Sequence, residues 1–176
     1  MELFLASTSA VAKFEEVITS FWQDPIDDDH VALTDAAIRD AEEKLGVRLP
    51  ASLLRLLRVR NGGRVADRWD AFPVEGSTWS EHHACFDYLD GILDEDGSSV
   101  IDTPYLVQEW ELPAPVVLLN GDGHWWVALD YRACGPTGEP SVVEINSDGP
   151  VVLFLASDFE SFVEGLTSSE QFLIDD

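Results

Sequence analysis

The sequence predicts an α+β domain in which helices pack on a mostly antiparallel sheet of about four to six strands. Helical periodicity dominates residues 9–60, whereas apolar or alternating runs of strand length dominate residues 116–155. One further helical pattern follows at residues 157–166. Strands that follow one another, without alternating helices, are typical of sequential antiparallel hairpins. The chain is therefore predicted to order its elements as helices, sheet and closing helix.

The first helix is predicted over residues 9–23, where Val11, Phe14 and Ile18 recur at three- and four-residue steps. Asp24-Pro25 ends this pattern. With 176 residues and no internal repeat, we expect a single domain over 1–176, with residues 1–30 as an N-terminal helical extension.

Two more helices are predicted between residues 34 and 63. Thr34 is a suitable N-cap, and Gly46 is a suitable C-terminal stop. The next helix opens at Pro50, whose missing N–H costs little in a first turn, and ends at Asn61-Gly62-Gly63. Leucines at 53, 54 and 57 are expected to form its buried stripe.

The strands are predicted at residues 68–74, 116–119, 124–131, 142–145 and 151–155. The last of these runs is apolar throughout, so we expect it to be central or covered on both faces. Residues 157–160 match the capping-box pattern, and the helix they begin is expected to bury its apolar stripe, made of Phe159, Phe162, Val163 and Leu166.

The stretch NGDGHWWVALDYR at residues 120–132 is predicted to be a turn followed by a strand. Alternation puts Trp125, Val127, Leu129 and Tyr131 on one apolar face. The other face carries His124, Trp126, Ala128 and Asp130. If that face is open, Trp126 is a candidate anchor for a protein partner; if a helix or loop covers it, Trp126 belongs to the core.

The charge is concentrated in the second half of the chain. Residues 1–68 hold 12 acidic and 9 basic residues, whereas residues 69–176 hold 22 acidic residues and one basic residue, Arg132. Direct nucleic-acid binding and binding to anionic membranes are disfavoured, because both require Lys and Arg. A basic protein partner is favoured electrostatically, although solubility or adaptation to salt would also explain the acidity.

Composition also restricts location and redox chemistry. No apolar run approaches the roughly 20 residues of a membrane span, and the first residues lack the basic region of a secretion signal. We therefore expect a cytoplasmic protein whose two cysteines, Cys85 and Cys134, are thiols.

One short segment contains residues capable of catalysis or metal binding. His82, His83, Cys85 and Asp87 lie close in sequence, yet their spacing fits no common zinc pattern. The alternative is an acidic surface loop or a packed segment. No metalloprotease, hydrolase, phosphate-loop or dinucleotide motif occurs in the sequence, so we expect no enzyme activity, no metal and no cofactor.

A family resemblance is carried by several motifs in order. The segment LTDAAIRDAEEKLGVRLPASLLRLLRVRNGG at 33–63 resembles the opening helices of the SUKH superfamily, which includes a fungal cell-wall-assembly regulator and many bacterial immunity proteins. The turn and strand NGDGHWWVALD and the closing LASDFESFVEGL resemble later parts of the same pattern. Ala36-Ala37 and the pair Ser52 and Leu54 depart from it, at positions where acidic or aromatic residues are usual.

The resemblance implies a non-catalytic α+β protein that binds and neutralises a polymorphic toxin, often a nuclease. A basic nuclease domain suits the acidic second half of this chain. The residues expected to bind such a partner are Trp79, Glu81, Asp87, Asp94, Glu95, Asp96, Trp110, Asp122, His124, Trp126 and Asp130. The alternatives are a regulatory scaffold that binds other proteins and an enzyme that uses the His82-His83-Cys85 segment.

Overall fold

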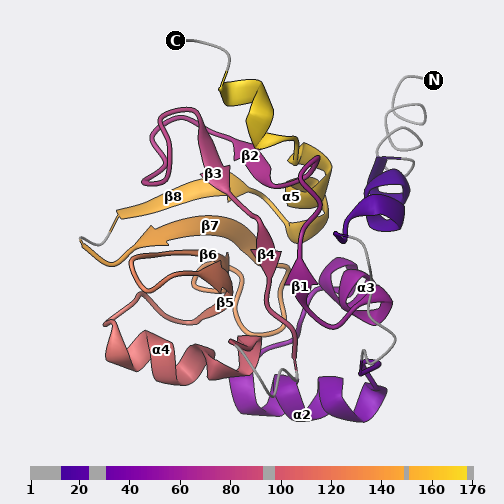
Figure 1. Cartoon of the computed structure of the whole chain (residues 1–176). Coiled ribbons are helices and arrows are strands. Elements are labelled where there is room, and N and C mark those ends of the chain that lie inside the picture. The colour runs from indigo at the N-terminus through magenta and orange to yellow at the C-terminus, as the bar shows by residue number, and fades with distance from the viewer. Residues whose placement is uncertain (1–12, 24–30, 93–97, 149–150, 174–176) are drawn as a thin grey trace, which may run out of the picture.

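The structure is a computed structural model that describes residues 13–23, 31–92, 98–148 and 151–173. Its centre is a four-stranded antiparallel sheet in sequence order, and helices pack against both faces (Figure 1). The strands of this main sheet are β5 (Val116–Gly121), β6 (Trp125–Asp130), β7 (Ser141–Asn146) and β8 (Val151–Ala156). The predicted fold class is thereby confirmed.

Two small two-stranded sheets, built from residues between 63 and 89, lie beside the main sheet. They pair β1 (Gly63–Arg64) with β4 (Tyr88–Leu89), and β2 (Ala71–Pro73) with β3 (His83–Cys85). The strand predicted at 68–74 is thus present only as the shorter β2.

The helices are α2 (Asp35–Leu45), α3 (Ala51–Val59), α4 (Thr103–Glu109) and α5 (Phe159–Gly165), together with the 3-10 turns η1 (Val100–Asp102) and η2 (Ser169–Phe172). Residues 13–20 are also helical, and the earlier part of the predicted first helix lies outside the described residues. Phe14 and Val17 from this segment are buried in the same core as the sheet.

The helix ends follow the predicted local chemistry. The Thr34 hydroxyl accepts the Ala37 N–H at 3.2 Å, and Gly46 ends α2 with a φ of 70°. At α5 the cap is Asp158, whose carboxylate accepts the Ser161 N–H at 2.7 Å. Asp158 is thus the N-cap in place of Ser157, and Ser161 stands where a capping box has Glu or Gln, so α5 begins with a single cap bond and not with the capping box predicted at residues 157–160.

The main sheet separates two apolar clusters. Trp125, Val127 and Leu129 face the larger cluster, which includes the N-terminal helices and α5. Trp126 and Ala128 face a smaller cluster completed by Leu106 and Val107 of α4. The predicted alternation along β6 is therefore correct, and α4, which the sequence did not reveal, covers the second face.

One strand differs from its prediction. β8 is not central, because it pairs only with β7 among the described strands and forms one edge of the main sheet. Val151 and Phe154 are 58% and 59% exposed. Leu155 and Ala156 are buried, so only the exposed residues Val151 and Phe154 of this apolar run are not explained by burial within the described residues.

Candidate functional site

The turn between β5 and β6 is built by residues 121–124. Asp122 accepts the backbone N–H groups of His124 at 2.9 Å and of Trp125 at 3.3 Å. Partial desolvation raises the pKa of Asp122, but these backbone donors lower it by more, so the carboxyl stays ionised below its usual pH range. Gly123 has a φ of 98°, which glycine adopts without strain. The Gly-Asp-Gly motif is therefore fully used by the turn.

Two partly exposed indoles lie on opposite faces of the sheet at this turn. Trp79 packs against Trp125, with ring centroids 5.7 Å apart, and Trp110 packs against Trp126 at 5.8 Å. Trp125 and Trp126 project to opposite faces because they are consecutive in a strand. Trp79 is 53% exposed and Trp110 is 40% exposed. We name Trp79, Trp110, Asp122 and His124 the hairpin-tip surface.

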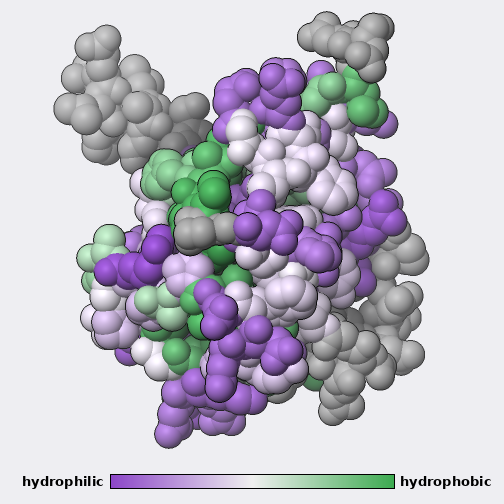
Figure 2. All heavy atoms as spheres, turned by 90° about the vertical axis from the view of Figure 1, so that its left-hand side faces the viewer, coloured by the Kyte–Doolittle hydropathy of each residue, from purple (hydrophilic) through white to green (hydrophobic). Residues whose placement is uncertain are grey.

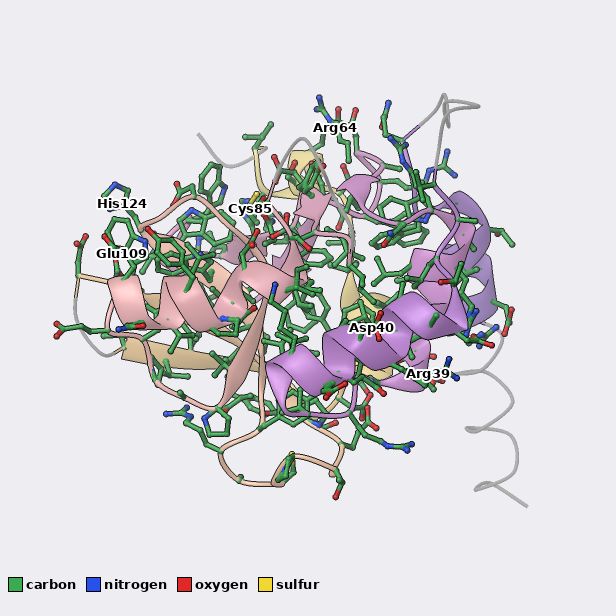
Figure 3. All side chains as sticks on the ribbon, turned by 90° about the horizontal axis from the view of Figure 1, so that it is seen from below. Arg39, Asp40, Arg64, Cys85, Glu109 and His124 are labelled. Carbon is green, nitrogen blue, oxygen red and sulfur yellow. The ribbon has the colours of Figure 1, made fainter. Side chains whose placement is uncertain are left out.

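His124 completes this surface on the side of α4. Its ring lies 6.2 Å from that of Trp110, in an edge-on arrangement. Figure 3 shows His124 beside Glu109, at the end of α4 that precedes Trp110. The indole, the imidazole and the nearby carboxylates together offer an apolar centre with a polar rim.

A buried carboxylate holds the loop that carries Trp79. Glu144 of β7 is 2% exposed and points to the larger cluster, yet it lies under residues 77–78 of the loop between β2 and β3. It accepts the Ser77 hydroxyl at 2.7 Å, and both the N–H and the hydroxyl of Thr78 at 2.8 Å. Sequence reasoning missed Glu144, although a lone acid in VVEIN at a core-facing position was a usable signal.

A shallow hollow of about 350 Å³ adjoins Trp110. Two carboxylates and the ends of α4 and β7 line it, through Trp110, Glu111, Leu112, Pro113, Asn146, Ser147 and Asp148. Figure 2 shows this end of the molecule, where hydrophilic residues surround a band of apolar ones. The hollow extends the hairpin-tip surface with further negative charge.

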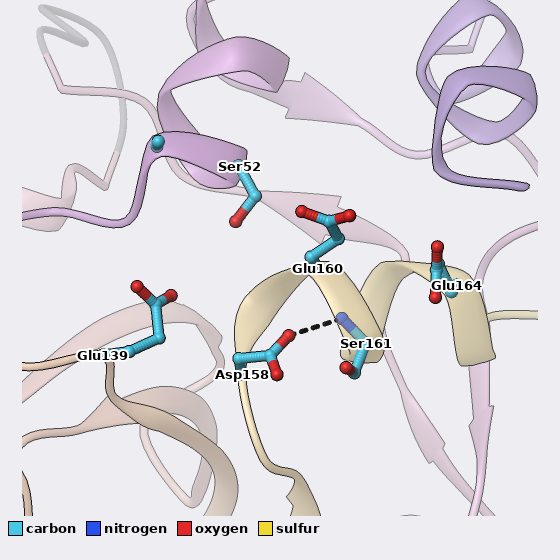
Figure 4. A pocket seen from close by; sticks show the side chains of 7 residues that line it. Ser52, Glu139, Asp158, Glu160, Ser161 and Glu164 are labelled. Atoms are coloured by element: carbon cyan, nitrogen blue, oxygen red, sulfur yellow. Dashed lines mark hydrogen bonds between the residues drawn. The ribbon is translucent and has the colours of Figure 1, made fainter. Parts of the chain in front are cut away.

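A second acidic hollow of about 360 Å³ lies between α3, α5 and the loop after β6 (Figure 4). Its carboxylates come from Glu139, Asp158, Glu160 and Glu164. Burial, followed by the charges of Asp158 and Glu160, raises the pKa of Glu139. Burial and the charge of Glu160 likewise raise the pKa of Glu164. None of these four residues was predicted as a site residue.

The structure removes one predicted residue from the accessible surface. Trp126 is 3% exposed, since α4 and the residues after it cover the face on which it lies. Of the two interpretations of this face, the covered one is correct, and the hypothesis of Trp126 as an open anchor is wrong for this structure.

The remaining predicted residues are spread over the molecule. Glu81 is exposed and follows Trp79 by two residues on the same loop. Asp130 lies at the opposite end of β6, where Arg132 binds it at 2.7 Å and lowers its pKa. Asp87 is exposed and lies in the short connection between β3 and β4, more than 30 residues before the β5–β6 turn in the sequence. Asp94, Glu95 and Asp96 lie outside the described residues.

The segment with His82, His83 and Cys85 is not arranged for nucleophilic chemistry. Burial, followed by the charge of Asp87, raises the pKa of the Cys85 thiol to about 12. His83 is buried and stacks on Phe172 at 4.6 Å, and burial lowers its pKa. Within the described ranges, no three His, Cys, Asp or Glu side chains are grouped to hold a metal ion.

Positive charge lies mainly on the other side of the molecule and is partly paired. Arg55 binds Glu15 and Arg58 binds Asp35, each at 2.5 Å. Figure 3 shows Arg39 on α2, far from His124. The part of the chain that the structure describes also contains no helix with the length and apolar character needed to cross a bilayer.

The pattern of the SMI1/KNR4 family (SUKH-1) matches residues 32–165, which is most of the chain. The chain belongs to the SMI1/KNR4 family. This result confirms the resemblance to the SUKH superfamily drawn from the helices at 33–63 and the later turn and helix. SUKH domains are generally non-enzymatic domains that act in immunity or in binding. Membership of this family is consistent with an immunity-type role for the chain. No curated protein gave a significant match.

Proposed function

We propose that this SMI1/KNR4-family chain is an immunity protein that binds a basic toxin domain and neutralises it by covering its surface. A nuclease domain is the toxin class with the best-suited chemistry, because nucleases carry Lys and Arg to hold phosphates. The mechanism is stoichiometric binding in the cytoplasm, with no reaction at the immunity protein itself.

The observation that carries the proposal is the hairpin-tip surface. Trp79 and Trp110 expose about half of their side-chain surface, yet each is fixed by packing against a buried indole. Rigid, partly exposed aromatic residues supply contact area with little loss of conformational entropy on binding, which makes them good anchors.

Electrostatics supports a basic partner over a neutral one. Arg132 is the only basic residue after position 68, and Asp130 already neutralises it. Residues 69–176 therefore produce a negative electrostatic field, and their sequence contains no unpaired Lys or Arg that would weaken it. Such a field accelerates encounters with a cationic protein.

The direct test begins with a search of the neighbouring genes for a basic toxin-like domain, which is then co-expressed with this chain. We expect the chain to rescue growth and to form a one-to-one complex with the purified domain. Trp79→Ala and Trp110→Ala should each weaken the complex by at least ~30-fold, which corresponds to about 2 kcal/mol. Val59→Ala, at an exposed site on α3, is the matched control and should leave affinity unchanged.

Salt dependence distinguishes this function from that of a regulatory scaffold. Association with a cationic toxin should slow steeply as the salt concentration rises from roughly 0.05 to 0.5 M, because salt screens exposed charges. An association rate that does not change with salt, together with normal binding by both Trp variants, would reject the proposal.

A further inference from the structure

The two edges of the main sheet differ. The β5 edge is closed by other parts of the chain, because the Asp90 N–H donates to the Leu119 carbonyl at 2.8 Å and the Leu118 N–H donates to the Thr103 hydroxyl at 3.0 Å. The β8 edge has no counterpart. Among the described residues, the backbone of β8 is hydrogen-bonded to β7 alone.

An open edge of this kind is a template for another strand. An edge strand of an antiparallel pair directs about half of its backbone N–H and C=O groups away from its neighbour. Proteins usually protect such edges with charged residues, proline or bulges. β8 has the sequence VVLFLA, which contains neither charge nor proline. Its register with β7 shifts at Leu155, between the pairs of Ala156 and Phe154, so only Val151 to Phe154 form a regular edge.

The side chains of β8 are also incompletely covered. Phe154 pairs with Val143 and Val152 pairs with Ile145, so both lie on the face that carries Trp126 and α4. The smaller apolar cluster includes Val143 and Ile145, with Val152 packed against it, but Phe154 remains 59% exposed. This cluster therefore continues to the sheet edge as an exposed apolar strip.

Acidic residues flank β8 in the sequence, and they belong to the two acidic hollows described above. Asp148, in the hollow beside Trp110, shortly precedes β8. Asp158 and Glu160, in the hollow of Figure 4, directly follow it. A strand of six residues spans about 20 Å, so a partner segment of roughly eight or nine residues would reach both ends.

We infer that the open edge of β8 accepts an extended segment of the basic protein partner, which is apolar in its middle and carries Lys or Arg at both ends. The segment would add a fifth strand to the main sheet. Its alternate side chains would cover Phe154 and Val152, while its cationic ends would meet the acidic hollows. This inference rests on the proposed function, because it specifies how part of the same cationic partner binds.

A second copy of this chain is a poorer occupant. Antiparallel pairing of two β8 strands would place the acidic residues at the start of one strand near those at the end of the other. Each chain also carries a net charge of −24. Charge complementarity thus favours a cationic segment over self-pairing.

The first test uses the full chain and synthetic peptides, followed by fluorescence anisotropy. The probe is a nine-residue peptide of alternating threonine and valine with a lysine at each end. Two matched peptides carry glutamate at the ends or N-methyl groups on the central backbone amides. We expect the lysine-ended peptide to bind at least ~10-fold more tightly than either, because only it offers both cationic ends and free backbone donors.

Variants of the chain locate the binding. Phe154→Thr keeps a residue suited to strands but removes the exposed ring, and should weaken the lysine-ended peptide by at least ~5-fold. Asp148→Asn should lower the affinity for the lysine-ended peptide and make that affinity less dependent on salt. Val31→Thr, at a 66% exposed position away from β8, is the control and should leave binding unchanged. Equal binding of all three peptides, or a Phe154→Thr variant that binds normally, would overturn the inference.

The second test distinguishes this inference from the proposed function. In the complex with the toxin domain, hydrogen exchange at the amides of residues 151–156 should slow markedly. A complex that depends on Trp79 and Trp110 but leaves these amides unprotected would refute strand addition and leave the proposed function intact. A dimer of the free chain that Phe154→Thr dissociates would assign the edge to a second copy and would equally refute the inference.

Discussion

Replacing Glu144 tests whether one buried carboxylate fixes the Trp79 loop. In Glu144→Ala, the Ser77 hydroxyl and both donors of Thr78 lose their acceptor. Hydrogen bonds to a charged group contribute about 1.5–3 kcal/mol each. The variant also recovers the several kcal/mol, in order of magnitude, that desolvating a carboxylate costs. We therefore expect a net loss of about 2–4 kcal/mol in the free energy of unfolding.

Glu144→Gln is the matched variant. Its side-chain oxygen still accepts from Thr78, and its amide can donate to the Ser77 hydroxyl oxygen, so we expect a loss of only about 1 kcal/mol. Urea unfolding of both variants measures these values. Near-UV circular dichroism reports the Trp79–Trp125 pair, whose rings are fixed 5.7 Å apart. The signal of this pair should be largely lost in Glu144→Ala and retained in Glu144→Gln.

A double-mutant cycle of Glu144→Ala and Thr78→Ala tests whether these two residues stabilise the loop through their mutual bond. Because Thr78→Ala removes the hydroxyl that donates to Glu144 and keeps the backbone N–H, the two substitutions should be non-additive by about 1–2 kcal/mol. Additive losses, or a Glu144→Ala variant as stable as the parent chain with an unchanged near-UV spectrum, would show that the carboxylate does not hold this loop.

Three further predictions concern the turn, the acidic hollow and the thiols. Gly121→Ala would place a Cβ atom within 3 Å of the Trp126 ring, so we expect at least ~2 kcal/mol of destabilisation in thermal unfolding; a normal melting temperature would contradict this packing. Burial and Glu160 raise the folded-state pKa of Glu164 above 4.5, so the folded chain loses stability as pH rises from 4.5 through that pKa. Glu164→Gln should therefore raise the melting temperature at pH 7 and not at pH 3.5, and an equal change at both would argue against the repulsion. Iodoacetamide at pH 8 should label the exposed Cys134 and spare Cys85, whose pKa is about 12, as mass spectrometry of the native chain will show; rapid labelling of Cys85 would restore the enzyme hypothesis.

Local features were predictable because their chemistry is local. The cap of α2 at Thr34, its end at Gly46 and the alternation along β6 each depend on a few adjacent residues. α4 was missed because it is short and has only two partly buried apolar residues, Leu106 and Val107, which leave little periodicity.

Features that depend on distant residues were not predictable. Glu144 meets its partners 66 and 67 positions away, and no sequence pattern joins them. Trp126 could not be assigned to surface or core without knowledge of α4. The apolar run of β8 is typical of a buried strand, because composition alone does not show that the strand lies at an edge with Val151 and Phe154 exposed.

The attachment of the Trp79 loop has a consequence for how new specificities arise. The anchoring bonds use Ser77 and Thr78, whereas Trp79 and Glu81 face outward and do not bond to Glu144. Substitutions at positions 79 and 81 therefore leave the bonds to Glu144 in place, and only a change at Trp79 also removes the packing on Trp125. Random libraries limited to residues 79–82 should yield folded chains with altered partner choice, because the loop sequence changes while the sheet beneath it does not.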